Sequence, residues 1–100
     1  MAARPADEWE VELSERAELD YSNLPDDIQQ EASELLDELR WDPFPQGHLQ
    51  MRRYNDVYRL RMANDRFRVV YRVDRRNRLV KVFRLRPRGT AYAGLKSPRH

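Results

Sequence analysis

Arginines recur two residues apart in the second half of this sequence. Each of the three strand-like runs there contains or adjoins such a pair: Arg59 and Arg61, Arg66 and Arg68, and Arg84 and Arg86. Alternate residues of a β-strand point to the same face, so each pair would project side by side from one sheet. Guanidinium groups bind phosphate oxygens through parallel hydrogen bonds and stack on bases. The pattern therefore predicts a sheet that binds a polyanion.

The charges of the sequence are divided between its two halves. Residues 1–50 contain 14 acidic and three basic residues, whereas residues 51–100 contain 16 basic and three acidic residues. The net charge of +2 hides this separation. Such a concentration of like charge opposes folding unless something neutralises it. Phosphate binding is favoured over a merely solvated sheet face, because Lys, the usual solubilising cation, is nearly absent.

The composition excludes several other classes of protein. No cysteine is present, which removes disulfides, thiolate catalysis and Cys-ligated metals. No apolar run approaches the roughly 18 residues of a membrane span, and the first residues lack the apolar stretch of a signal peptide. His48 and His100 are too far apart in the sequence to suggest a metal site. We expect one cytoplasmic domain over residues 1–100 without metal or cofactor.

Alternation and capping signals place the first elements. Apolar residues alternate with glutamates over residues 8–13, which predicts a strand with one buried face. Ser14 is a good helix N-cap, so a short helix is expected over 15–23. Pro25 suits the first position of a second helix over 25–40, which carries one apolar stripe.

Three strands joined by short turns are predicted in the basic half. Two prolines and a glycine in residues 41–47 predict a loop before them. The strands are Val57–Met62, Arg66–Asp74 and Arg78–Arg86. The short segments between them suit hairpins, so an antiparallel meander is expected.

Alternation in these strands predicts which face each side chain occupies. The face toward the helices would consist of Tyr58, Leu60, Met62, Phe67, Val69, Tyr71, Val73, Leu79, Phe83 and Leu85. The opposite face would carry Val80, Val82 and four arginines, namely Arg59, Arg61, Arg68 and Arg86. Lys81 falls on the apolar side by this count, so we expect it near an edge, where its stem reaches water.

Six short motifs stand in a characteristic order along the chain. They are Trp9-Glu10-Val11, Leu24-Pro25-Asp26-Asp27, Trp41-Asp42-Pro43, Tyr58-Arg59-Leu60-Arg61, Arg66-Phe67-Arg68-Val69-Val70-Tyr71 and Arg86-Pro87-Arg88-Gly89-Thr90-Ala91-Tyr92. Together they resemble the RelE/ParE toxin superfamily over a core of residues 8–95. The resemblance implies a small α+β fold with two N-terminal helices on a twisted, mostly antiparallel four-stranded sheet. A short C-terminal helix or turn would follow.

The RelE branch of this superfamily implies a toxin that cuts mRNA in the ribosomal A site. Its cleavage leaves a 2′,3′-cyclic phosphate and a 5′-hydroxyl, and it is specific for RNA because DNA lacks the attacking 2′-hydroxyl. The resemblance implies catalytic roles for Arg59, Arg61, Arg68, Arg86 and Tyr92, with Arg86 as the general acid and Tyr92 as a stacking or orienting group. Further RNA contacts are expected from Arg52, Arg53, Arg66, Arg84 and Arg88.

One departure from the family keeps other functions open. Well-studied members have Lys where this chain has Arg59 and Arg61, and Arg stays protonated and is a poor general base. His48 could supply a base, although a solvent-facing polar role in the loop is favoured for it. The alternatives are a ParE-like inhibitor of DNA gyrase without catalysis, and a RelE-fold protein that binds RNA or ribosomes without cleaving.

The resemblance also implies partners. A cognate RelB-like antitoxin with an acidic segment would neutralise the basic half of the chain. The ribosome and mRNA would be the other partners, no membrane is involved, and the free toxin is expected to be a monomer.

Overall fold

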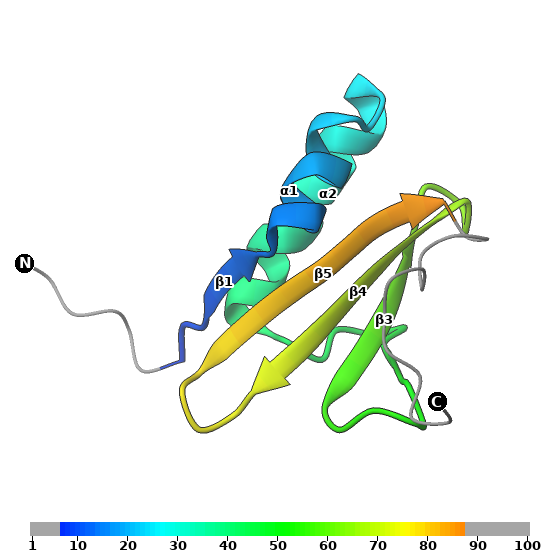
Figure 1. Ribbon diagram of the computed structural model, residues 1–100. Helices are drawn as coiled ribbons and strands as arrows, with labels where there is room; N and C mark the ends of the chain where they lie inside the picture. Colours follow the sequence, from blue (N-terminus) through cyan, green and yellow to red (C-terminus); the bar gives the residue numbers. More distant parts are fainter. Residues whose placement is uncertain (1–6, 88–100) are drawn as a thin grey trace, which may run out of the picture.

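Two helices lie against a five-stranded sheet in the computed structural model, which describes residues 7–87 of the chain (Figure 1). The elements in chain order are β1 (Glu10–Leu13), α1 (Glu15–Ser22), α2 (Asp26–Trp41), β2 (Leu49–Gln50), β3 (Val57–Met62), β4 (Phe67–Asp74) and β5 (Leu79–Pro87). The six elements predicted from the sequence are confirmed, with ends that differ by two residues at most. Neither helix of this described part is both long and apolar enough to cross a membrane.

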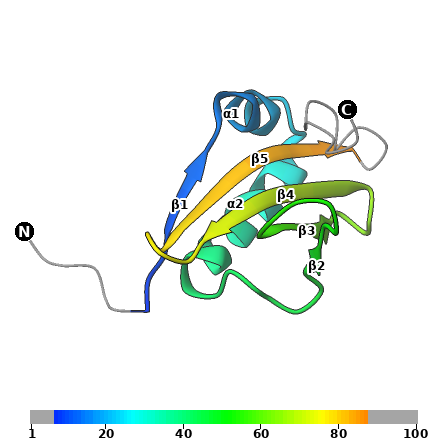
Figure 2. The same cartoon turned by 60° about the horizontal axis from the view of Figure 1, so that its bottom comes forward.

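The sheet has the strand order β1-β5-β4-β3-β2 (Figure 2). β1 pairs with β5 in parallel, with Glu10 opposite Leu79, and all other neighbours are antiparallel. The predicted four-stranded, mostly antiparallel sheet is therefore wrong, because the sheet is five-stranded and mixed. The missed strand, β2, is two residues long, and alternation cannot reveal a strand so short.

The helices begin where capping residues place them. The Oγ of Ser14 accepts a hydrogen bond from the N–H of Ala17 at 3.1 Å, which starts α1. Pro25 precedes α2, and Asp26 and Asp27 occupy its first turn, where acidic side chains favour the helix dipole. α2 buries Ile28, Ala32 and Leu39 against the sheet. The apolar stripe read from the sequence is therefore a core face.

The main core lies between α2 and the inner face of the sheet. Its sheet side consists of Tyr58, Leu60, Met62, Val69, Tyr71, Val73, Val80, Val82 and Leu85. Tyr71 is fully buried, and its hydroxyl donates a hydrogen bond to the carbonyl of Pro43 at 2.8 Å. Burial raises the pKa of Tyr71 above its usual value, so the hydroxyl keeps its proton. This bond ties the loop after α2 to the centre of the sheet.

β5 changes faces halfway along its length. The register with β4 shifts between Val70 and Tyr71, so that Val82 pairs with Tyr71, Arg84 pairs with Val70 and Phe83 has no partner in β4. An extra residue of this kind reverses the alternation beyond it. Val80 and Val82 therefore face the core, which corrects the predicted outward position of both. Phe83 instead packs with Val57 and Val70 in a second, smaller cluster.

The same irregularity explains Lys81, which alternation had placed on the apolar side. Lys81 pairs with Arg72 of β4 and with Glu12 of β1, so it lies in the interior of the sheet rather than near an edge. Its Nζ is 3.6 Å from Oε2 of Glu12. Because its neighbours Val80 and Val82 face the core, Lys81 points to the opposite face, where its charge reaches water and an acidic partner.

Beyond Val82 the edge of β5 has no strand beside it, and α1 takes over that edge. The N–H of Ser14 continues the β1 ladder onto the carbonyl of Val82 at 2.9 Å, and the Oγ of Ser14 donates to the carbonyl of Phe83 at 3.1 Å. The carboxylate of Asp20 then accepts the N–H of Leu85 at 3.0 Å. The same carboxylate binds Nε of Arg84 at 2.9 Å. One acidic residue of α1 thus caps the strand edge and pairs a buried arginine.

Replacing Asp20 should destabilise the fold strongly. The side chain of Asp20 is 11% exposed and that of Arg84 is 5% exposed, so Asp20→Ala removes the carboxylate that pairs a buried guanidinium and accepts the N–H of Leu85. We expect a loss of about 3 kcal/mol in the free energy of unfolding, measured by urea denaturation. Glu38→Gln, a change at an exposed position of α2, should stay within about 0.5 kcal/mol of the parent. Equal stability of the two variants would contradict this role of Asp20.

The Tyr71 hydroxyl gives a second test of the core. Tyr71→Phe removes the donor to the buried carbonyl of Pro43 and should lower the free energy of unfolding by about 1–2 kcal/mol. Tyr54→Phe is the matched control, because Tyr54 is only partly buried and lies in the smaller cluster. A change of the same size in both variants would show that the Pro43 contact contributes nothing.

Candidate nucleic-acid interface

Three arginines stand in one row across the outer face of the sheet. Arg61 of β3 pairs with Arg68 of β4, and Arg68 pairs with Arg86 of β5. Neighbouring strands lie about 4.8 Å apart, so the three side chains leave the sheet from adjacent positions. We call Arg61, Arg68 and Arg86 the arginine row. The shared face expected for these residues from alternation is confirmed by the register, and Arg59 lies one step away, opposite Val70.

Two acidic residues balance the arginine row. Oδ1 of Asp65 lies 3.4 Å from Nε of Arg61 and also accepts a hydrogen bond from Nη1 of Arg68. At the other end, Oδ1 of Asp20 lies 4.0 Å from Nε of Arg86. Like charges placed directly opposite on a sheet repel each other. The carboxylates therefore allow the three cations to stand side by side.

The members of the row differ in their access to solvent. The side chains of Arg61 and Arg86 are 57% and 37% exposed, whereas that of Arg68 is 4% exposed. Nε of Arg68 is buried without a hydrogen-bond partner in the described part of the chain. Arg84, expected to contact RNA, is instead buried against Asp20. Arg61 and Arg86 can thus meet a ligand directly, and Arg68 lies beneath the surface between them.

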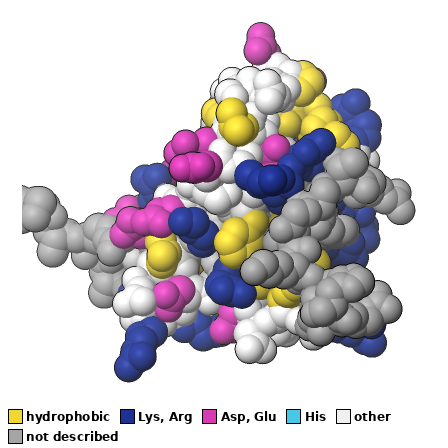
Figure 3. Space-filling model, viewed as in Figure 1, with side chains coloured by type: hydrophobic (Ala, Val, Ile, Leu, Met, Phe, Trp, Pro, Cys, Tyr) yellow, Lys and Arg dark blue, Asp and Glu magenta, His cyan; other side chains and the backbone are white. Residues whose placement is uncertain are grey.

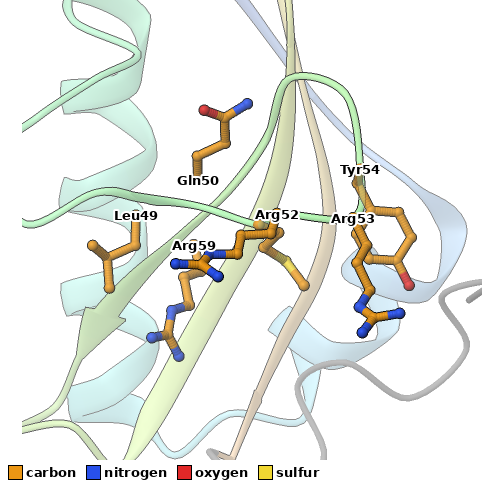
Figure 4. Close-up of a pocket in the computed structure, with 7 residues that line it drawn as sticks. Leu49, Gln50, Arg52, Arg53, Tyr54 and Arg59 are labelled. Carbon is orange, nitrogen blue, oxygen red and sulfur yellow. The ribbon is translucent and has the colours of Figure 1, made fainter. Parts of the chain in front are cut away.

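A second group of cations surrounds a hollow of about 400 Å³ beside β2 and the turn that follows it (Figure 4). Its lining consists of Leu49, Gln50, Met51, Arg52, Arg53, Tyr54 and Arg59. Arg52 and Arg53 are exposed in this turn, which the bond from the N–H of Met51 to the carbonyl of Val57 closes at 2.8 Å. Figure 4 shows the guanidinium groups of Arg52 and Arg59 on the same side of the hollow. An anionic chain could contact both at once.

An apolar patch on the outer face connects this hollow, with which it shares Met51 and Tyr54, to Phe83 of β5. Val57 and Val70 are buried there, and Met51, Tyr54 and Phe83 pack against them. The guanidinium of Arg72 lies 5.8 Å from the ring of Phe83. Aromatic rings flanked by cations are what bases stack on in single-stranded nucleic acids. Sequence reasoning missed Phe83 as a surface residue because only the irregular pairing of β5 turns it outward.

Charge is also separated over the surface as a whole. Figure 3 shows acidic side chains gathered near β1, while basic side chains are spread over the rest of this face. Arg66, another expected RNA contact, is exposed, and its Nε donates to the carbonyl of Ala63 at 3.2 Å. A polyanion that approaches this molecule is therefore attracted to the basic strands of the sheet rather than to β1, its acidic edge strand.

The remaining candidates lie elsewhere. The Nδ1 of His48 is 2.9 Å from the carbonyl of Pro45, and its ring packs at 5.6 Å from that of Tyr58, so His48 is a half-buried packing residue. Its expected solvent-facing position is wrong. Arg88 and Tyr92 lie outside the described residues. Within residues 7–87, no three acidic or histidine side chains gather closely enough to hold a metal ion.

Comparison with known proteins identifies the family. The model of the ParE toxin family of type II toxin–antitoxin systems, parDE, matches residues 11–92. No curated protein matches the sequence.

Solved structures of RelE toxins share the fold. The archaeal RelE–RelB complex from Pyrococcus horikoshii OT3 superimposes with a TM-score of 0.68 and 26% identity, covering 83% of this chain and 98% of that one. The intact E. coli RelBE toxin–antitoxin complex superimposes with a TM-score of 0.71 and 20% identity, covering 79% of this chain and 95% of that one. The toxin–antitoxin complex RelBE2 from Mycobacterium tuberculosis superimposes with a TM-score of 0.70 and 23% identity, covering 81% of this chain and 99% of that one.

The family match covers most of the chain, and the fold agrees with it. This chain therefore belongs to the ParE toxin family, within the RelE/ParE superfamily, and is a toxin of a type II toxin–antitoxin system.

Proposed function

We propose that this toxin is a ribosome-dependent endoribonuclease that cleaves mRNA in the A site. The observation that carries the proposal is the arginine row, in which Arg61, Arg68 and Arg86 face one strip of the sheet surface. Three adjacent guanidinium groups match the oxygens of a phosphodiester, whose negative charge increases as the reaction proceeds. The aromatic patch beside the row offers stacking positions for the neighbouring bases.

The reaction assigns each arginine a role. The ribose 2′-oxygen attacks the adjacent phosphorus and loses its proton, the bond from phosphorus to the 5′-oxygen breaks, and the 5′-oxygen takes up a proton from Arg86, which regains one from water. The products are a 2′,3′-cyclic phosphate and a 5′-hydroxyl. Arg61 holds the phosphate at the surface, and the buried Arg68 stabilises its developing charge from beneath. Arg59 extends the phosphate-binding surface.

The general base is supplied from outside the described side chains. Arginine remains protonated in proteins, so no member of the row can accept the 2′-proton. His48 is held by the Pro45 carbonyl and packs among aromatic rings, which does not suit a base. Either the ribosome or the RNA itself takes this proton, and Tyr92 orients the substrate. This assignment accounts for the requirement for the ribosome.

The proposed partner in the resting cell is a RelB-like antitoxin with an acidic segment. The solved complexes of RelE toxins with RelB antitoxins support this partner. The basic half of the chain supports the acidic character of the segment, because the 16 cations of residues 51–100 meet only three acids within that half. The antitoxin would cover the arginine row, and the free toxin would be a monomer.

A second candidate function is inhibition of DNA gyrase without catalysis. The matching family model is named for ParE toxins, which supports it directly. The row of arginines lacking a base of its own fits a binding role as well as a catalytic one. The first candidate acts on mRNA and the second on DNA gyrase, so one assay for each target separates them.

Cleavage should depend on the exposed members of the row. Purified toxin added to a translating ribosome complex should produce cuts in the A-site codon, mapped by primer extension. Arg61→Ala and Arg86→Ala should each lower the rate of cutting about a hundredfold, because each removes a donor to the transition state. Arg76→Ala is the matched control, an exposed arginine in the turn between β4 and β5, and should cut like the parent. Intact mRNA with tight ribosome binding would indicate a non-catalytic toxin.

Gyrase provides the opposite test. Under the proposed function, supercoiling of relaxed plasmid by purified gyrase should be unchanged at toxin concentrations that give complete mRNA cleavage. If the parent and Arg61→Ala inhibit supercoiling equally and neither cuts mRNA, the ribonuclease function is contradicted and gyrase inhibition is supported.

A further inference from the structure

Asp65 lies in the turn between β3 and β4, where one carboxylate oxygen contacts two arginines of the row. Its Oδ1 is 3.4 Å from Nε of Arg61 and accepts a hydrogen bond from Nη1 of Arg68. The side chain of Arg61 is mostly exposed, that of Asp65 is 36% exposed and that of Arg68 is buried. A single negative group thus stands between the two guanidinium groups, at the boundary between solvent and the buried arginine.

Arg68 is incompletely bound by this contact. Its Nη1 donates to Oδ1 and to the backbone carbonyl of Asp65, the latter at 3.3 Å, while its buried Nε has no acceptor among the described residues. Guanidinium groups bind anions best through two parallel hydrogen bonds from neighbouring nitrogens. A buried donor without an acceptor is unfavourable. Arg68 therefore lacks one acceptor, which a tetrahedral anion with several oxygens could provide.

The turn that holds Asp65 has an unfavourable backbone. Ala63, Asn64 and Asp65 follow one another in the left-handed region, with φ of 54°, 53° and 71°. One contact from outside and one within the turn stabilise it: the N–H of Ala63 donates to Oε2 of Glu31 in α2 at 2.8 Å, and the N–H of Arg66 donates to the carbonyl of Ala63 at 3.1 Å. Release of the Asp65 carboxylate would let this turn relax toward commoner conformations.

We propose that Asp65 is an internal competitor for phosphate in this toxin. In the free protein its carboxylate occupies the position between Arg61 and Arg68 that the phosphate of the substrate takes, and a bound phosphate displaces it. Asp65 thereby sets the affinity of the arginine row for anions. The identity of the ligand, an RNA phosphate, rests on the proposed function, whereas the competition itself rests on the geometry of the turn.

The test is a titration of the toxin with inorganic phosphate, followed through the ¹⁵N-resolved Nε–H signals of arginine. Asp65→Asn removes the competing charge but keeps a residue that tolerates the left-handed region. Asp65→Gly removes the carboxylate and favours this backbone still more. Both variants should bind phosphate about tenfold more tightly than the parent. The Nε–H signal of Arg68 should shift most, because this donor gains its acceptor.

Asp56→Asn is the matched control. Asp56 also has a positive φ, of 55°, and its Oδ1 lies 3.6 Å from Nε of an arginine, Arg75, outside the row. Its replacement should leave phosphate affinity unchanged. Unchanged or weaker phosphate binding by both Asp65 variants would overturn the proposal and make Asp65 a group that only positions Arg68. A gain of equal size in Asp56→Asn would overturn it too, as a general effect of net charge.

The titration separates this inference from the proposed function, because it involves neither RNA nor ribosomes. If the Asp65 variants bind phosphate more tightly but the toxin cuts no mRNA, the competition is supported and the proposed ribonuclease activity is contradicted. If the toxin cuts mRNA in the A site but its phosphate affinity does not change when Asp65 is replaced, the ribonuclease activity is supported and the competition is contradicted.

Discussion

The arrangement of this toxin depends on how one open strand edge is closed. β1 accompanies β5 only as far as Val82, and beyond that point the edge of β5 opposite β4 has no neighbouring strand among the described residues. Ser14 and Asp20 supply the missing partners from α1, first to Phe83 and then to Leu85. The carboxylate that completes the edge also neutralises a buried arginine. The last half of β5, and with it one end of the arginine row, is therefore held by β4 on one edge and by α1 and its N-cap on the other.

Charge balance follows the same logic over the rest of the outer face. Three guanidinium groups on adjacent strands would repel one another, and each end of the row has an acidic residue from a different element. These carboxylates come from a turn and a helix, so the strands themselves remain almost purely basic and apolar. The surface offered to a ligand is thus strongly positive, although the whole chain carries a charge of only +2. Binding an anion exchanges one negative partner for another and leaves the cations in place.

The helices and strands could be predicted from the sequence more reliably than the way in which the strands pair. Alternation locates β3 and β4, and Ser14 and Pro25 mark the helix starts, because these signals lie within a few residues of each other. The parallel pairing of β1 with β5 joins residues about 70 positions apart and leaves no local trace. Likewise, no residue near Phe83 indicates the extra residue that shifts the pairing of β5 with β4. Alternation therefore predicted the wrong face of the sheet for Val80 and Val82. The arginine row was foreseen as a common face, but the partners that bury Arg68 and Arg84 belong to distant or irregular segments.

The pairing of β1 with β5 also governs when the molecule can become a toxin during its own synthesis. Among the strands of residues 7–87, β5 is the last to leave the ribosome, and until it does, β1 lacks its partner in this part of the sheet and Arg86 is missing from its place. Contacts so distant in sequence form late and slowly. A nascent chain that has displayed only β3 and β4 presents two of the three arginines on an unclosed sheet. The complete arginine row therefore forms only after β5 has been synthesised and has paired with β4.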